Sequence, residues 1–137
     1  MNKIEWIDSV VGKPWVDRAD GPDYFDCWGV VLDSFLRVDE KPLHNVEGYD
    51  SGELIETAGA REAQGWPEIG SPIDGCVFCV ILASGDMIHV GRIFQVGSGL
   101  VAVHAAGKYG NGQTVAEPIR AIKERFKHRL HYYTRPQ

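Results

Sequence analysis

The chain has 137 residues and a mass of 15.2 kDa, the size of one domain with one core, so we expect residues 1–137 to fold as a single domain. Hydrophobic residues make up 44% and charged residues 24%, a composition that excludes an intrinsically disordered chain. Acidic residues outnumber basic ones, 19 to 14, and the net charge of −5 argues against nucleic acid as a partner.

The sequence carries no sign of a membrane segment or a secretory signal. No run approaches the roughly 18 consecutive apolar residues that a transmembrane helix needs, so we expect no membrane partner. No apolar stretch follows Lys3, which predicts synthesis in the cytoplasm and a separate route to any site outside the cell. The three cysteines are an odd number, which argues against a disulfide framework.

The first half of the chain is predicted to be helical. Apolar residues at helical spacing predict a short helix over residues 2–11 and a second from Asp26 or Cys27 to about Val38, with Asp26 as its N-cap. Between them, residues 16–25 are rich in Asp, Gly and Pro and predict a loop. A third helix is expected over residues 52–64.

The second half changes to the pattern of strands. Strands are predicted over residues 76–82, 88–95, 100–106, 114–120 and 130–134, with one or two helical turns over 119–126. Helices followed by a meander of strands indicate an α+β fold, with the N-terminal helices packed on an antiparallel sheet of about five to six strands.

Cys27 is the best candidate for a nucleophile. It follows a polar loop and begins a predicted helix, where the partial positive charge of the helix N-terminus favours the thiolate. The alternative is a cysteine packed as a small hydrophobic residue. Cys76 and Cys79 lie in an apolar strand that would point them to opposite faces, so a zinc or redox role is not expected for them.

A nucleophilic cysteine needs a base, and histidine is the usual one. Two of the five histidines, His89 and His104, interrupt apolar strands that follow one another in the chain. A turn at 96–97 places them directly opposite, about 5 Å apart, and a turn at 97–98 makes them diagonal neighbours on one face. A three-residue turn centred on 98 places them on opposite faces. A pair could act as base and orienter, or could simply be two histidines satisfied in a half-buried sheet.

Four short segments resemble the NlpC-type family of papain-like cysteine peptidases. Family members carry G-x-P-Y, a D-C-x-G nucleophile that begins a helix, an H-V-G strand and a polar residue, often His, on the next strand. The matching segments are Gly12-Lys13-Pro14-Trp15, Asp26-Cys27-Trp28-Gly29, His89-Val90-Gly91 and Val103-His104-Ala105. They occur in the family's order and approximate spacing, and the resemblance covers about Lys3 to Tyr133, nearly the whole chain.

The resemblance implies a cysteine hydrolase with a Cys-His-His triad. Cys27 is then the nucleophile, His89 the base and later the acid, and His104 the orienter. The implied substrate is the stem peptide of peptidoglycan, cut between γ-D-glutamate and a diamino acid, and the implied chemistry needs no metal and no organic cofactor.

Two positions depart from the family pattern and bear on substrate binding. Trp15 stands where the family often has a Tyr that helps the oxyanion, and Trp28 stands where it often has a Ser that helps bind the free amine of the stem peptide. Asp26 remains available for that amine. We therefore expect Trp15, Asp26 and Trp28 to line the oxyanion and substrate sites, in a form that differs from the family's.

The D-C-W-G variant and the small size resemble peptidases of phage and prophage tails. This resemblance implies delivery to the cell wall by a virion, with other tail proteins as partners. Two alternatives stay open: a weakly active or inactive structural or binding module of a tail, and a hydrolase of another amide or thioester, such as a secreted toxin effector.

Overall fold

The computed structural model describes residues 1–43, 65–107 and 111–136. Two helices, α1 (Lys3–Val10) and α2 (Cys27–Arg37), precede the strands, as the sequence predicts. The strands are β1 (Glu68–Ile69), β2 (Val77–Ile81), β3 (Met87–Val96), β4 (Gly99–Ala105), β5 (Thr114–Pro118) and β6 (Leu130–Tyr133). Helix α4 (Ile119–Phe126) and a 3₁₀ turn (Lys127–Arg129) connect β5 to β6.

The described strands form one antiparallel sheet in the order β1-β6-β2-β3-β4-β5. This confirms the predicted α+β class and the antiparallel sheet of five to six strands. The two-residue strand β1 is not among the predicted elements, because it is too short to show a period of two. The helix expected over residues 52–64 lies outside the described residues.

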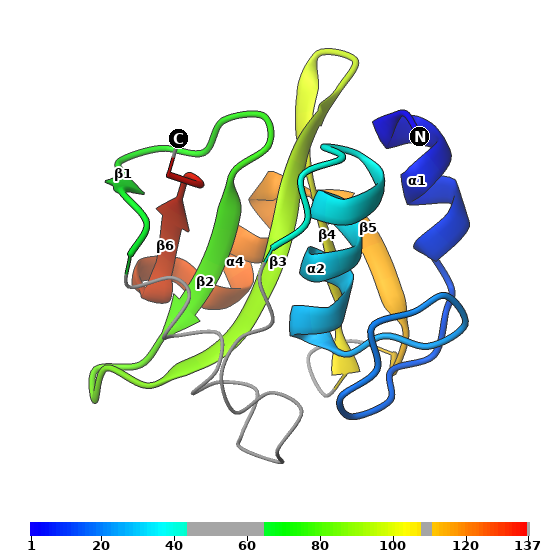
Figure 1. Cartoon of the computed structure of the whole chain (residues 1–137). Coiled ribbons are helices and arrows are strands. Elements are labelled where there is room, and N and C mark those ends of the chain that lie inside the picture. The colour runs from blue at the N-terminus through cyan, green and yellow to red at the C-terminus, as the bar shows by residue number, and fades with distance from the viewer. Residues whose placement is uncertain (44–64, 108–110, 137) are drawn as a thin grey trace.

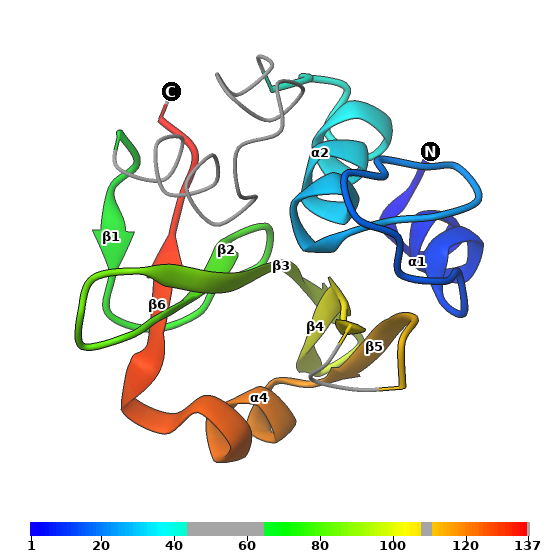
Figure 2. The same ribbon diagram turned by 90° about the horizontal axis from the view of Figure 1, so that it is seen from below.

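The sheet is covered on both faces (Figures 1 and 2). Helices α1 and α2 pack on one face, and α4 lies on the other. Val77, Cys79 and Val90 point to the α2 face, whereas Phe78 and Val80 point to the α4 face with Ile122 and Phe126 of that helix. Because β2 is buried on both faces, its sequence is a continuous apolar run rather than an alternating one.

Helix α2 is held against the loop that precedes it. Asp26 caps the helix, with its Oδ1 accepting a hydrogen bond from the backbone N–H of Gly29 at 2.6 Å. A Cβ at Gly29 would lie 1.9 Å from the carbonyl oxygen of Ala19, so the loop packs directly on the first helical turn. Val30, Val31 and Phe35 then face the sheet and are fully or almost fully buried.

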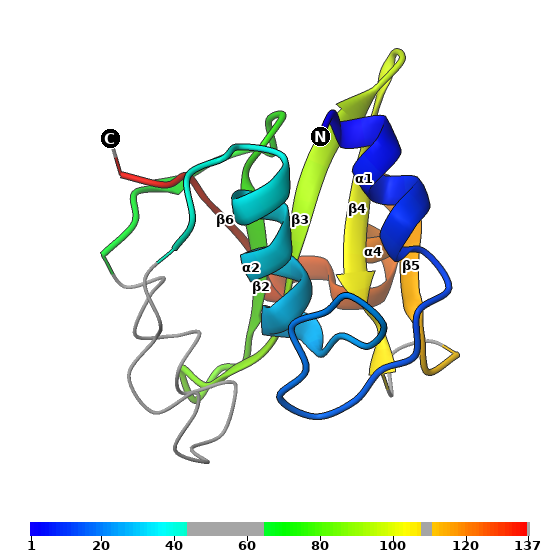
Figure 3. The ribbon, with the colours of Figure 1, turned by 45° about the vertical axis from the view of Figure 1, so that its right-hand side comes forward.

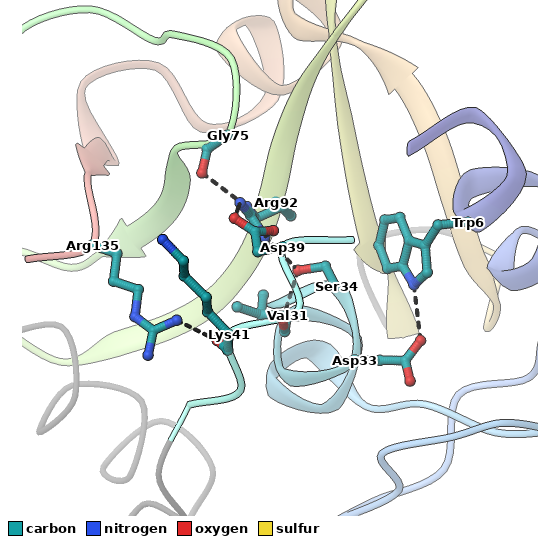
Figure 4. A network of polar contacts seen from close by, with 9 residues as sticks. All are labelled: Trp6, Val31, Asp33, Ser34, Asp39, Lys41, Gly75, Arg92 and Arg135. Carbon is teal, nitrogen blue, oxygen red and sulfur yellow. Dashed lines mark hydrogen bonds and ion pairs between the residues drawn. The ribbon is translucent and has the colours of Figure 1, made fainter. Parts of the chain in front are cut away.

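A buried arginine joins the end of α2 to β3 (Figure 4). The guanidinium of Arg92 donates to Ser34 Oγ at 2.9 Å and to both carboxylate oxygens of Asp39 at 3.0 Å, while its Nε donates to the carbonyl of Gly75 at 2.8 Å. It also lies 3.7 Å from the centre of the Phe35 ring. Burial lowers the pKa of Arg92, and the hydrogen bond to Asp39 opposes that shift. The hydrogen bonds of this buried guanidinium therefore connect β3 to α2, to the residues after α2 and to the turn before β2.

A second buried contact joins the two N-terminal helices. The indole Nε1 of Trp6 donates to Asp33 Oδ2 at 2.8 Å (Figure 4). Arg37 Nε donates to the other oxygen of that carboxylate at 2.8 Å. Trp6 is fully buried, so its N–H requires a partner inside the protein. The position of α1 therefore depends on α2.

The register of β3 and β4 requires glycine at position 91. Gly91 directly precedes the last printed pair of this ladder, Arg92 with Val103, and a Cβ at Gly91 would lie 2.7 Å from the Cβ of His104 and 2.3 Å from the ring of Phe78. Neither neighbour can move without disturbing a buried contact, because both side chains are fully buried.

We expect Gly91→Ala to lower the free energy of unfolding by about 1–3 kcal/mol, the usual cost of overpacking a core. Gly99→Ala is the matched control, since the next strand begins there and a Cβ would meet nothing within 4 Å. Urea unfolding followed by tryptophan fluorescence measures both variants. Equal midpoints for the two variants would contradict the close approach of β3, β4 and Phe78.

Candidate active site

Cys27 is the first residue of α2 and is 7% exposed. Its place at a capped helix N-terminus agrees with the sequence prediction. It belongs to the buried cluster on the α2 face that also contains Cys79, Val90 and Ala105. Val90 and Ala105 directly follow His89 and His104 in the chain, and because successive strand residues alternate faces, the two imidazoles lie on the α4 side of the sheet with Phe78.

The beginnings of α2 and β3 and the end of β4 lie at the same end of the molecule, the lower end in Figures 1 and 3. The helix also packs against both strands. Cys27 is the first residue of α2, His89 is the third residue of β3, and His104 is the next to last residue of β4. The three predicted catalytic residues therefore lie at the ends of these elements that share this side of the molecule.

His89 and His104 form the predicted pair. Val96 pairs with Gly99, so the turn consists of Gly97 and Ser98, and the histidines are diagonal neighbours on one face. The Nε2 atom of His89 lies 2.8 Å from Nδ1 of His104. This hydrogen bond confirms the second of the three predicted registers. The catalytic roles of the two residues stay predictions.

A β-bulge lies at the beginning of β3. Val80 pairs with His89 and Ile81 pairs with Met87, so Ile88 has no residue opposite it. A bulge changes the direction of the side chains next to it. Here Met87 belongs to the α2-face cluster, and Ile88 packs against the α4-face cluster. The bulge thus shifts, just before His89, which residues of β3 point to each face of the sheet.

Aromatic rings surround the two imidazoles. His89 is 3% exposed and His104 is fully buried. The ring of Phe78 lies 5.9 Å from that of His89 and 5.5 Å from that of His104, and Phe126 lies 6.0 Å from His89. Such an environment excludes water and strengthens the hydrogen bond between the imidazoles.

The pair continues to a carboxylate that the sequence analysis did not identify. Nε2 of His104 lies 2.8 Å from Oε1 of Glu117, and Arg125 donates to both oxygens of that carboxylate at 2.9 and 3.2 Å. The hydrogen bond from His104, with help from Arg125, lowers the pKa of Glu117 to about 2. His104 pairs with Val115, so Glu117 is its diagonal neighbour on β5. A Glu inside a predicted strand was the available signal, but its register depends on the connection from β4.

Asp26 is fully buried, and both carboxylate oxygens accept backbone hydrogen bonds. Oδ1 accepts from Gly29 and Oδ2 accepts from the N–H of Arg18 at 2.8 Å. The predicted capping role is confirmed. Both oxygens of this carboxylate are therefore already bonded to backbone N–H groups of the protein. The role of Asp26 in binding a substrate amine stays a prediction.

The two tryptophans near the site have different surroundings. Trp15 is 38% exposed, and its ring lies 3.3 Å from where a Cβ of Gly107 would be, just beyond β4. Trp28 is 2% exposed and belongs to the α2-face core, and its Nε1 has no hydrogen-bond partner among the described residues. Trp15 therefore presents a surface that a substrate can contact, whereas Trp28 is part of the core. Their predicted roles at the oxyanion and substrate sites remain predictions.

The remaining cysteines are buried free thiols on opposite faces of the sheet. Burial raises the pKa of both Cys76 and Cys79. In the described parts of the chain, no group of three or more His, Cys, Asp or Glu side chains is arranged to hold a metal ion. Nor does any described helix have the length and apolar character needed to cross a membrane.

The comparisons with known proteins bear on the fold. The sequence matches no family model and no curated protein. The structure is similar to the crystal structure of the NlpC/p60 domain of the peptidoglycan hydrolase SagA, with a TM-score of 0.59 and 14% sequence identity over 97% of this chain and 95% of that one. At this identity the similarity shows the fold alone, and the chain therefore has the NlpC/p60 papain-like fold that its motifs predict.

Proposed function

We propose that this chain is a cysteine hydrolase that cleaves an amide bond in the stem peptides of peptidoglycan. The observation that carries the proposal is the buried hydrogen bond between His89 and His104, at the end of the sheet where α2 begins with Cys27. A helix N-terminus favours a thiolate, and an oriented imidazole is the usual partner of a nucleophilic cysteine. The NlpC/p60 fold, seen in a peptidoglycan hydrolase, supports the substrate class.

The proposed reaction begins with transfer of the Cys27 thiol proton to Nδ1 of His89, since Nε2 of that ring faces His104. It requires the sulfur to reach this nitrogen where α2 meets the end of the sheet. The thiolate attacks the amide carbonyl, and the oxyanion of the tetrahedral intermediate is stabilised by the positive end of α2, with the backbone N–H of Cys27 as the proposed donor.

Collapse of this intermediate breaks the C–N bond, and the imidazolium of His89 gives its proton to the leaving amine. The product on the enzyme is a thioester. Water, deprotonated by His89, then attacks the thioester carbonyl, and the thiolate leaves as the acid product is released. Throughout, His104 holds the imidazole of His89 in one orientation.

The finer assignments rest on the sequence motifs. We propose the bond between γ-D-glutamate and a diamino acid as the scissile bond, and the cell wall as the place of action. Delivery by a phage or prophage tail, with tail proteins as partners, is proposed on the D-C-W-G variant. An assay on isolated peptides does not depend on the route of delivery.

One observation favours a second candidate, a binding module with a papain-like fold and no turnover. Cys27 is only 7% exposed, and the neighbouring Trp28 is buried. A thiol that a substrate cannot reach would make the fold a scaffold. The reactivity of Cys27 separates the two candidates.

The wild-type protein should release the diamino-acid fragment from purified stem peptides, as measured by mass spectrometry. Cys27→Ala should abolish turnover, and His89→Ala should lower kcat/KM by about 10²–10⁴-fold, the usual contribution of a general base. Cys76→Ala and His131→Ala are the matched controls, since Cys76 does not begin a helix and His131 contacts Glu68 at the other edge of the sheet rather than either histidine of the pair. Turnover by Cys27→Ala at the wild-type rate would contradict the proposed nucleophile.

Iodoacetamide should label Cys27 of the folded protein in preference to Cys76 and Cys79, because burial raises the pKa of those two thiols. An ordinary thiol, with a pKa of about 8.5, holds less than about 1% thiolate at pH 6, so labelling that persists at pH 6 indicates an activated cysteine. His89→Ala should slow labelling at pH 6, and peptide mapping by mass spectrometry measures each site. Labelling of Cys27 only after unfolding would favour the binding module.

A further inference from the structure

Four side chains from four elements form one continuous chain of polar contacts. Arg125 of α4 donates to Glu117 of β5, Glu117 contacts Nε2 of His104 of β4, and Nδ1 of His104 contacts Nε2 of His89 of β3. The contacts between these groups measure 2.8–3.2 Å. The chain runs from a surface guanidinium to the imidazole that the proposed function assigns as the base.

Glu117 can only accept hydrogen bonds, since its carboxylate is ionised. Its pKa of about 2 follows mainly from the hydrogen bond with His104, and Arg125 contacts both of its oxygens. The carboxylate is 20% exposed, whereas the imidazole of His104 is fully buried. The interaction between them is therefore screened less than an ion pair on the surface.

An acceptor at this position determines where the protons of both rings lie. Because Glu117 accepts, Nε2 of His104 must carry the hydrogen. A neutral imidazole carries only one, so Nδ1 of His104 is an acceptor. Nε2 of His89 must then donate to it, which leaves the lone pair of the neutral His89 ring on Nδ1. That is the atom to which the proposed reaction transfers the thiol proton.

We propose that Glu117, held by Arg125, is a positioning residue that sets the tautomers of His104 and His89 so that Nδ1 of His89 is the basic nitrogen. This inference rests on the proposed function, because it specifies how the base of that site is prepared. When His89 becomes an imidazolium, the negative charge of Glu117, which His104 connects to it by hydrogen bonds, stabilises the positive charge. Glu117 itself does not contact the reacting atoms.

The tautomers are measured on the protein without substrate, by ¹⁵N NMR of the histidine side chains at a pH where the rings are neutral. In the wild type, both His89 and His104 should carry hydrogen on Nε2. In Glu117→Leu the buried N–H of His104 loses its acceptor, so both rings should shift toward the Nδ1–H form. Glu117→Gln retains an acceptor oxygen without the charge, and both rings should keep the wild-type tautomer.

Glu68→Leu is the matched control. Glu68 also contacts a histidine, His131, at 3.2 Å, but at the far edge of the sheet, and its loss should leave His89 and His104 unchanged. In Glu117→Leu the rate of Cys27 alkylation near pH 6 should fall by about 10- to 100-fold, less than the roughly 10⁴-fold loss seen when the direct partner of a catalytic histidine stabilises the wrong tautomer.

Two results would overturn the inference: an Nδ1–H tautomer of His89 in the wild type, or unchanged tautomers in a Glu117→Leu protein whose circular dichroism shows that it is folded. If Glu117→Leu does not fold, the tautomer of His89 measured in the wild type decides whether the inference holds. Because the NMR measurement needs no substrate, the expected tautomers in a protein that cleaves no stem peptide would refute the proposed function and leave the role of Glu117 intact.

Discussion

The candidate site depends on one constraint, the fixed position of α2 across the sheet. The buried guanidinium of Arg92 provides it at the end of the helix, through Ser34, Asp39 and the ring of Phe35. A buried charge is tolerated only when its donors are satisfied, so the segments around Arg92 cannot shift independently. Asp26 provides the constraint at the other end, because it caps the helix and accepts a hydrogen bond from the preceding loop. Cys27 is thereby placed at a defined end of the sheet.

Burial on both faces of the sheet shapes the chemistry of the histidine pair. The rings of Phe78 and Phe126 exclude water around His89 and His104, and a buried imidazole needs a partner at each polar nitrogen. His104 has such partners on both sides, His89 at one nitrogen and Glu117 at the other. The same packing that stabilises the fold therefore holds the imidazole of His104, and through it that of His89, in a single orientation.

Much of this arrangement could be predicted from local patterns. The period of the apolar residues predicted the helices and strands, and the capping role of Asp26 followed from its place before α2. The His89–His104 pair was predicted in two of three registers, and the two-residue turn at Gly97-Ser98 selected one of them. Gly97 has a φ of 62°, a conformation that glycine adopts without strain, so a turn there was chemically favoured.

Three features could be predicted from local patterns in the sequence: the class of the fold, a cysteine at a helix N-terminus, and two histidines on successive strands. These features follow from spacing and from the preferences of a few adjacent residues. The partners of those residues depend on how the elements pack in three dimensions. Glu117 reaches His104 only through the register of β4 and β5, and Arg125 reaches Glu117 from the following helix. Trp28 and Arg92 became core residues because α2 and the sheet bury them. Such contacts join side chains far apart in the chain, and no short-range pattern encodes them.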